Sequence, residues 1–434
     1  MPERIVNHSK YGHGVVKQSR YKDFELLVQF RDGLTRWVRF DELEQAATTP
    51  QIATLATPLP ALSFDKAFKS RRMIEAFRLG IVPYDCVEDF TFGRQEESKE
   101  LMNWLNSNNE NVLLLVGEYG TGKTHLLHYA YWRALQEGFA VAYVSMDPNE
   151  VPFYKPKRVY SHLISTFRYY SKEGKQNKRF RDFLGEAIAR GVFKDHAYFR
   201  HLIDKDSDEV LWNWIEASES IIRPYYSSNN NYLKLPGMYD HSTAANIYCY
   251  LLSALGWAAK KVLGLKGFLL IFDEAEIVDS ISSSPQRKRG LNFLKALILS
   301  AQNDKFLFEN PHLAGTKRDL DYSLSSIGRR TPFIYREPSA IKLFFAFTQT
   351  DTINQINRLN LIRKINLQSL PDTALKKVLE HVYLFYKNAY GNLKNNMSIE
   401  ELFQNVIKYG KYTRAFVKSA VEALDLIRLN QKIG

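Results

Sequence analysis

Four long apolar runs mark the central part of the chain: residues 112–116, 140–145, 268–272 and 343–347. Their lengths suit strands, and they lack the alternation of apolar and polar residues that a half-exposed strand shows. Segments with helical spacing separate them. Strands that are apolar on both faces are typical of a parallel sheet covered by helices on both sides. We therefore predict an α/β fold with these runs as its parallel strands.

The two ends of the chain have other patterns. Residues 1–46 contain short β-rich runs between turn-prone glycines, which predicts a small β barrel. Residues 47–65 are rich in Ala, Thr and Pro, and we assign them to a linker. Residues 66–366 form the predicted core, and residues 367–434 form a predicted helical lid. The spacing in the lid indicates three helices: 373–387, 398–409 and 413–429.

The most specific chemical signal follows the first apolar run. Residues 117–124 read Gly-Glu-Tyr-Gly-Thr-Gly-Lys-Thr, a complete G-x-x-x-x-G-K-S/T string between a strand and a helix. Glycines let backbone N–H groups surround a polyphosphate, and the helix adds its positive N-terminal end. Lys123 is expected to reach the β- and γ-phosphates, and Thr124 to bind Mg²⁺. The predicted nucleotide-binding residues are Gly117, Glu118, Tyr119, Gly120, Thr121, Gly122, Lys123, Thr124 and His125.

An acidic pair supplies the second half of such a site. Asp273 and Glu274 follow the third apolar run, so a buried strand delivers them to its carboxyl end. We predict that Asp273 holds Mg²⁺ and that Glu274 polarises the attacking water, a role whose loss costs roughly 10²- to 10⁴-fold in rate. A solvated acidic turn is the alternative. The predicted cofactors are ATP and Mg²⁺, with Thr124 and Asp273 on the metal.

The fourth run is followed by Thr348, which is predicted to position the water or to sense the γ-phosphate. The alternative for this residue is an ordinary polar strand end.

The composition narrows the class of protein. The 434 residues carry a formal net charge of +12, which favours polyanions as partners. Cys86 and Cys249 lie far apart without nearby ligand residues, so neither a disulfide framework nor a zinc site is expected. No apolar signal core follows Met1, and no apolar run is long enough to cross a bilayer. We expect a soluble cytoplasmic protein that makes no membrane contact.

Together the phosphate loop, the acidic pair, the polar strand end and the helical lid resemble the AAA+ ATPases. Residues 90–97 are similar to the G-R-x-x-E segment that several of these families place beside the adenine, which implies nucleotide contacts for Gly93 and Arg94. Residues 410–414 open the last predicted helix and resemble the second sensor of these proteins. The resemblance implies that Arg414 reaches the γ-phosphate from the lid.

The same resemblance implies a homo-oligomer in which an arginine from a neighbour completes each site. No spacing rule decides which arginine this is. The candidates are Arg329, Arg330, Arg358 and Arg363, of which Arg363 lies just before the turn into the lid.

Two shorter strings narrow the resemblance. Residues 71–80, part of a predicted amphipathic helix, and residues 151–156 resemble the ATP-binding family found with BREX-type phage-defence loci. This resemblance implies a role in prokaryotic antiviral defence alongside a helicase. The chain differs from the simplest AAA+ pattern in a large insertion at about residues 148–262.

The first part of this insertion has the composition of a nucleic-acid interface. Residues 151–202 contain twelve Lys or Arg against four Asp or Glu. Basic side chains neutralise phosphates and aromatic rings stack on exposed bases, so we predict contact with nucleic acid, with DNA favoured. The alternative is a solvated basic face with aromatics packed beneath it. The interleaved aromatics are Phe153, Tyr154, Tyr160, Phe167, Tyr169, Tyr170, Phe180 and Tyr198.

The N-terminal module carries a second resemblance. Residues 6–16, 28–33 and 37–38 are similar to the Tudor-like domain that ends superfamily-one repair helicases. Those domains dock on RNA polymerase or nucleic acid, so RNA polymerase is a candidate partner of residues 5–44.

Three hypotheses follow. The chain is an ATP-hydrolysing, DNA-associated protein of a defence complex, or a nucleotide-switched oligomeric scaffold or signalling ATPase, or a factor associated with RNA polymerase. Small-molecule phosphotransfer is disfavoured, because such kinases rarely carry so large a basic insertion.

Overall fold

The computed structural model describes residues 5–8, 11–20, 25–39, 43–44, 61–80, 87–171, 176–203, 208–218, 225–226, 232–233, 235–309, 316–317, 320–326, 331–356, 359, 362–391, 393, 397–410 and 412–429. The chain divides into two compact units, residues 1–61 and 62–434. Across these described ranges, no helix is both long and apolar enough to span a membrane.

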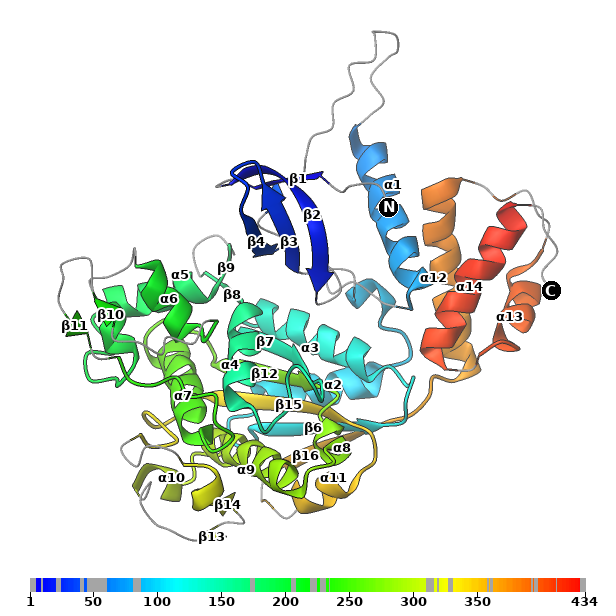
Figure 1. Cartoon of the computed structure of the whole chain (residues 1–434). Helices are drawn as coiled ribbons and strands as arrows, with labels where there is room; N and C mark the ends of the chain where they lie inside the picture. The colour runs from blue at the N-terminus through cyan, green and yellow to red at the C-terminus, as the bar shows by residue number, and fades with distance from the viewer. Residues whose placement is uncertain are drawn as a thin grey trace. The chain divides into compact units, whose positions relative to one another are not determined.

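The first unit is a small antiparallel sheet with the strand order β4-β3-β2-β1-β5 (Figure 1). Leu26, Val28 and Phe30 alternate along β3 and are buried, because successive side chains of a strand point to opposite faces. The predicted β module is confirmed as this sheet, while its likeness to Tudor-like domains stays a prediction. Its strands are β1 (Ile5–His8), β2 (Gly12–Arg20), β3 (Glu25–Phe30), β4 (Thr35–Arg39) and β5 (Leu43–Glu44).

The second unit is built on a five-stranded parallel sheet in the order β16-β6-β15-β12-β7, which confirms the predicted α/β fold. The four apolar runs are four of its strands. The fifth, β16, was not predicted: it lies at an edge, and its buried and exposed residues alternate, so no apolar run marks it. The strands are β6 (Val112–Gly117), β7 (Ala140–Ser145), β12 (Phe268–Asp273), β15 (Ile341–Phe347) and β16 (Ile362–Leu367).

Alternate side chains of these strands enter two separate cores. Helices cover both faces of the sheet (Figure 1). Leu113 packs in the core with residues of α2 and α3, and its neighbour Leu114 packs in the core on the opposite face. Because both faces are covered, the central strands show no polar alternation. The covering helices are α2 (Gln95–Asn106) and α3 (Lys123–Gln136) on one face, and α4 (Pro156–Ser165), α7 (Ala245–Lys261) and α9 (Ser284–Ala301) on the other.

The insertion at 148–262 contributes α4 and α7 to one face of the sheet, and most of the interleaved aromatic rings belong to the core on that face. The prediction that these rings stack on bases is wrong for six of the eight, because they are buried between the helices: Phe153, Tyr160, Phe167, Tyr169, Phe180 and Tyr198. Arg181 is paired with Glu209 and Glu216, and Lys178 with Glu186. The structure thus favours the alternative of aromatics beneath a basic face, and contact with DNA stays a prediction.

The lid shares its core with the first helix of the second unit. Met73, Ile74 and Phe77 of α1 (Ala61–Arg78) are buried in one cluster with the lid helices. Arg78 donates both Nε and Nη2 to the Asp425 carboxylate at 2.8–3.1 Å, which fixes α1 to the last helix. Since α1 begins at Ala61, the end of the stretch assigned to the linker is helical. The lid helices are α12 (Asp372–Tyr390), α13 (Ile399–Ile407) and α14 (Thr413–Arg428).

Short elements connect these parts. They are η3 (Glu88–Phe90), β8 (Tyr169–Tyr170), β9 (Asn177–Lys178), α5 (Phe180–Ala189), η4 (Phe199–Leu202), α6 (Glu209–Ile215), β10 (Tyr225–Tyr226), β11 (Tyr232–Leu233), α8 (Ile277–Ser280), α10 (Phe306–Glu309), β13 (Thr316–Lys317), β14 (Leu320–Asp321), η5 (Tyr322–Leu324) and α11 (Asp351–Ile356).

Candidate nucleotide-binding site

The glycine-rich string lies at the carboxyl edge of the sheet, where β6 ends at Gly117 and α3 begins at Lys123. Gly120 and Gly122 have φ values of +82° and +99°, in the left-handed region that a side chain rarely adopts. A Cβ on Gly122 would meet nothing within 4 Å, so there is open space beside this glycine. This conformation lets successive backbone N–H groups turn toward an anion.

Internal hydrogen bonds hold the loop in this shape. Lys123 Nζ donates to the carbonyl oxygens of Gly117 at 2.7 Å and Glu118 at 3.3 Å. The hydroxyl of Thr121 donates to Glu118 O at 2.8 Å. From outside the loop, the buried guanidinium of Arg94 donates to Thr121 O at 2.7 Å. The ammonium of Lys123 is therefore bonded to two carbonyls of the loop itself, and its contact with a phosphate stays a prediction.

The carboxylate of Asp273 is the meeting point of the two motifs. Its Oδ2 accepts from Thr124 Oγ1 at 2.7 Å and from the hydroxyl of Tyr143 at 3.0 Å, and its Oδ1 accepts from the N–H of Glu274 at 2.9 Å. The residue is only 3% exposed. Burial and the neighbouring Asp273 carboxylate raise the pKa of Tyr143 well above its usual range, so this phenol remains a donor.

Glu274 occupies an unusual backbone conformation beside this carboxylate. Its φ is +54°, which costs a residue with a side chain on the order of 1–3 kcal/mol. The following N–H, of Ala275, donates to Ala346 O of β15 at 3.0 Å and fixes the turn. The Glu274 side chain is exposed at the sheet edge while Asp273 points inward. The turn thus separates one buried carboxylate from one that meets solvent.

Below the loop, a histidine joins it to the segment before α2. Thr91 Oγ1 donates its hydrogen to Val87 O at 2.7 Å, so it accepts from Nε2–H of His125 at 3.0 Å. Burial, and then the nearby His128 and Arg94, lower the pKa of His125 to about 4. The imidazole is therefore neutral at pH 7, and its hydrogen bond ties the first turn of α3 to the segment before α2.

The segment predicted to lie beside the adenine contacts the lid and the loop. A Cβ on Gly93 would come within 2.6 Å of Ala374 Cβ on α12, so the main chain packs directly on the lid. Arg94 pairs with Glu97 at 2.8 Å in addition to its bond to the phosphate loop. Contact of these two residues with a nucleotide stays a prediction.

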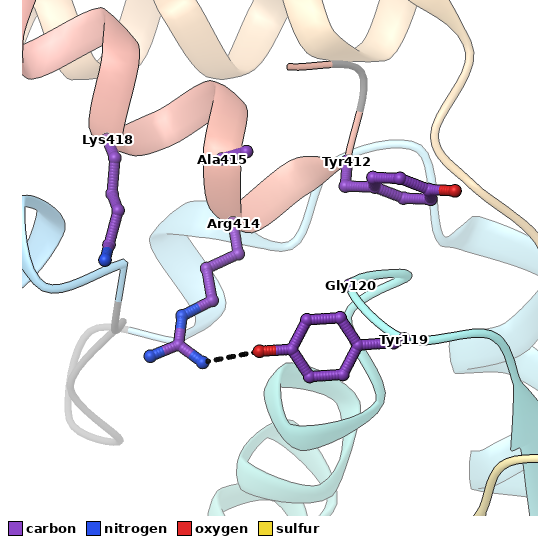
Figure 2. A pocket seen from close by; sticks show the side chains of 6 residues that line it. All are labelled: Tyr119, Gly120, Tyr412, Arg414, Ala415 and Lys418. Carbon is purple, nitrogen blue, oxygen red and sulfur yellow. Dashed lines mark hydrogen bonds between the residues drawn. The ribbon is translucent and has the colours of Figure 1, made fainter. Parts of the chain in front are cut away.

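The lid meets the phosphate loop at a hollow of about 370 Å³ (Figure 2). Arg414 of α14 points down toward Tyr119 of the loop, and its Nη1 lies 3.5 Å from the phenol oxygen. A Cβ on Gly120 would lie 3.0 Å from Tyr412 Cβ. The hollow is lined by Tyr119, Gly120, Tyr412, Arg414, Ala415 and Lys418.

The remaining predicted residues are separated from one another. Thr348 directly follows β15, whose neighbour β12 ends at Asp273, so it lies at the same edge as the phosphate loop. Arg363 pairs with Leu113 near the start of β6, at the opposite edge of the sheet, and forms a 3.0 Å ion pair with Glu110. The other arginine-finger candidates, Arg329, Arg330 and Arg358, lie outside the described residues.

The donor set at the carboxyl edge fits a nucleoside triphosphate with Mg²⁺. Among the residues that the structure describes, no group of three or more His, Cys, Asp or Glu side chains could hold a metal by itself. Mg²⁺ commonly uses one or two carboxylates together with substrate phosphates. Thr124 and Asp273, 2.7 Å apart beside an open glycine loop, supply the protein's part of such a site.

Sequence reasoning missed three residues of this site: Thr91, Tyr143 and Tyr412. Their contacts depend on neighbouring strands or on the lid, and no local string marks them. Tyr143 lies inside an apolar run, where a tyrosine is ordinarily a core residue.

A comparison with known families gives a match that covers most of the chain. The family model described as BREX system ATP-binding protein BrxC/D matches residues 66–179 and 204–434. A search of curated proteins found no significant match. The family match includes the phosphate loop, the acidic pair and the lid.

Proposed function

Because the chain belongs to the family of BREX system ATP-binding proteins BrxC/D, we propose that it hydrolyses ATP at the carboxyl edge of its parallel sheet. Family membership makes it an ATP-binding protein of a phage-defence system. The observation that carries the proposal is the hydrogen bond from Thr124 Oγ1 to Asp273 Oδ2. It brings together, at 2.7 Å, two motifs that are 149 residues apart in the sequence.

Each residue of the edge has a distinct role in this proposal. Lys123 leaves the carbonyls of Gly117 and Glu118 and binds the phosphates, while the loop N–H groups hold the remaining oxygens. Thr124 and Asp273 hold Mg²⁺, which when bound offsets the negative charge on the phosphates. Glu274, exposed and fixed by its turn, orients the attacking water and accepts its proton.

The lid completes the site in this account. Arg414 lies in the hollow above the phosphate loop, with Tyr119 as its partner (Figure 2). A short movement of this exposed guanidinium would take it from the phenol to a phosphate. Thr348, at the tip of β15, is placed to contact the water or the γ-phosphate.

The proposal is tested by measuring ATP binding and phosphate release on the full chain, with Mg²⁺ present, for the wild type and for Lys123→Ala. We expect saturable binding and turnover in the wild type. Loss of a charge-assisted contact worth about 1.5–3 kcal/mol should weaken binding in the variant by roughly 10- to 100-fold. A wild-type protein that binds ATP but releases no phosphate, alone or with its partners, would exclude hydrolysis.

A second function, a nucleotide-switched scaffold, is favoured by the contact between the lid and the phosphate loop. Since Gly120 touches Tyr412, a bound nucleotide can change the position of α14 without being hydrolysed. In phage-challenge assays, a scaffold would lose defence with Lys123→Ala and keep it with Glu274→Gln. An ATPase-driven function would lose defence with both.

Action on DNA, with a helicase or another defence protein as partner, extends the proposal. The net charge of +12 supports a polyanionic partner. Turnover measured with single- and double-stranded DNA over a range of salt concentrations tests this. On duplex DNA, the slope of the logarithm of the binding constant against the logarithm of the salt concentration is about −0.9 for each phosphate contacted. Absence of DNA stimulation and of DNA binding at low salt would remove DNA from the account.

Docking on RNA polymerase through residues 5–44, and assembly into a homo-oligomer, are separate extensions. Unchanged polymerase pull-down after deletion of residues 1–46 would dismiss the first. A protein that stays monomeric with ATP and Mg²⁺ would dismiss the second and, with it, an arginine supplied in trans.

A further inference from the structure

Tyr143 of β7 contacts the acidic pair through the carboxylate of Asp273. It lies on the face of the sheet covered by α3, and its register partner on β12 is Ile271, two residues before Asp273. From there the phenol reaches Asp273 Oδ2 at 3.0 Å, the same oxygen that accepts from Thr124. A carboxylate only accepts hydrogen bonds, so Tyr143 is the donor.

The main chain of Tyr143 is held from the other side by the insertion. β7 is an edge strand, and Thr166, the residue that follows α4, bridges its free edge. Thr166 Oγ1 accepts from Tyr143 N at 3.0 Å and donates to Tyr143 O at 2.7 Å. Next to it, Val141 and Arg168 exchange two backbone hydrogen bonds of 2.8 Å. A continuous chain of contacts therefore runs from the insertion through Tyr143 to Asp273.

We propose that Tyr143 is a positioning residue for the metal-binding carboxylate, and that Thr166 sets its place. This proposal rests on the proposed function, because it assigns Asp273 to Mg²⁺. With Thr124 and Tyr143 on Oδ2 and the Glu274 N–H on Oδ1, the carboxylate has donors on both oxygens. These donors fix the plane of the carboxylate before a metal binds. Loss of such a supporting hydrogen bond typically reduces metal affinity 10- to 100-fold.

A purely structural role makes a different prediction. A half-buried tyrosine hydroxyl that only satisfies a buried carboxylate would affect unfolding and leave metal dependence unchanged. The two roles are therefore separated by the concentration of Mg²⁺ needed for nucleotide binding, and unfolding alone does not separate them.

The experiment titrates MgCl₂ into the full chain with a fluorescent, non-hydrolysable ATP analogue. For Tyr143→Phe we expect a half-saturating Mg²⁺ concentration roughly 10- to 100-fold higher than in the wild type. Binding of the analogue in EDTA should be unchanged. Tyr335→Phe is the matched control: its hydroxyl also donates to an aspartate, Asp195, at 2.6 Å, but it lies before the start of β15 and touches neither Asp273 nor Thr166, so its Mg²⁺ midpoint should equal that of the wild type.

A second pair of variants keeps the test decisive if Tyr143→Phe does not fold. Thr166→Val removes the bridge to β7 and should raise the Mg²⁺ midpoint, while Thr166→Ser retains the hydroxyl and should restore it. A midpoint that stays at the wild-type value in Tyr143→Phe, or in Thr166→Val where only that variant folds, overturns the proposal. A wild type whose nucleotide binding does not respond to Mg²⁺ overturns the assignment of Asp273 instead.

Discussion

Two lysines at opposite edges of the parallel sheet both donate hydrogen bonds to backbone carbonyls, but their surroundings differ. At the amino edge, Lys342 is 7% exposed and donates to the carbonyl oxygens of Trp104, Ser107 and Glu110 at 2.8–2.9 Å. At the carboxyl edge, Lys123 also donates to carbonyls, but these belong to a glycine-rich loop with open space beside Gly122.

The difference lies in the backbone that each lysine binds. The partners of Lys342 are the end of α2 and the turn into β6, and its ammonium also lies 4.9 Å from the centre of the Trp104 ring. Loss of the lysine would remove a charged donor from three carbonyls, of which, among the described residues, only Trp104 O keeps a second partner, the N–H of Ser107. The partners of Lys123 lie in a partly exposed loop, where we expect a bound anion to replace the carbonyls as the partner of the ammonium. We therefore expect Lys342 to stabilise the fold and Lys123 to be available to a bound anion.

The largest expected effect separates carboxylates at the two edges. Glu274→Gln should reduce ATP turnover by roughly 10²- to 10⁴-fold while ATP binding is retained, because it removes the base and leaves Asp273 in place. Glu137→Gln, at the end of α3 near the amino edge, alters an ion pair with Lys266 and should leave turnover unchanged. Phosphate release under saturating ATP measures both. Equal turnover in wild type and Glu274→Gln would remove Glu274 from the chemistry.

The two lysines should respond oppositely to the same substitution. Lys342→Met should lower the free energy of unfolding by about 2–4 kcal/mol, because three carbonyls lose a buried donor, and should leave ATP affinity unchanged. Lys123→Met should change stability by less than about 1 kcal/mol and weaken ATP binding. Denaturant unfolding and equilibrium binding on both variants provide the comparison. A destabilised Lys123→Met with normal ATP binding would contradict the assignment of ATP binding to Lys123 and of stability to Lys342.

Acid should lower the free energy of unfolding through His125, which lies near the carboxyl edge of the sheet. Its pKa of about 4 in the folded chain lies below the ordinary value of 6.5, so the unfolded chain binds more protons between these values. Stability contributed by the neutral ring is present above pH 6.5 and is lost as the pH falls toward 4. We expect a loss of about 1–2 kcal/mol, since the ring is partly exposed.

The measurement is the pH dependence of thermal unfolding in the wild type and in His125→Gln. The variant should show a weaker dependence between pH 6.5 and 4 than the wild type. The exposed His241→Gln is the control, and it should follow the wild type. Identical curves for the wild type and His125→Gln would contradict a neutral, half-buried imidazole.

The smallest expected effect concerns backbone strain, which occurs at both edges. Ala340, before β15, and Glu274, after β12, have φ values of +51° and +54°. Replacing either with Gly should stabilise the fold by about 0.5–1 kcal/mol, because glycine adopts this conformation without strain. Only Glu274→Gly should lose turnover. Denaturant midpoints and phosphate release check this, and a destabilised Ala340→Gly would show that its strain is compensated by packing.

The sequence allowed prediction of those parts of the site that lie in one continuous stretch. The phosphate loop, the acidic pair after β12 and the four apolar strands each carry a local signal. The fifth strand, β16, carries a weaker alternating pattern because it is half exposed at an edge. Contacts formed between distant segments carry none. Tyr143 and Asp273 are 130 residues apart, and their bond follows from the register of β7 against β12.

The basic, aromatic part of the insertion shows why composition is a weaker guide than a motif. The same rings would suit base stacking or a packed core, and only burial distinguishes the two. Phe153 and Phe167 are buried against the sheet, with ring centroids 5.9 Å from Phe272 and 5.0 Å from Phe268. A core residue and a binding residue can be the same amino acid, so the neighbours across the fold decide its role.

The most direct measurement of the central claim is a structure of the full chain with a non-hydrolysable ATP analogue and Mg²⁺. The account predicts the triphosphate inside the loop of Gly120 and Gly122, Lys123 on a phosphate oxygen and no longer on Gly117 O, and Mg²⁺ beside Thr124 and Asp273. A nucleotide bound elsewhere, or Lys123 still bonded to Gly117 O with the analogue present, would contradict it.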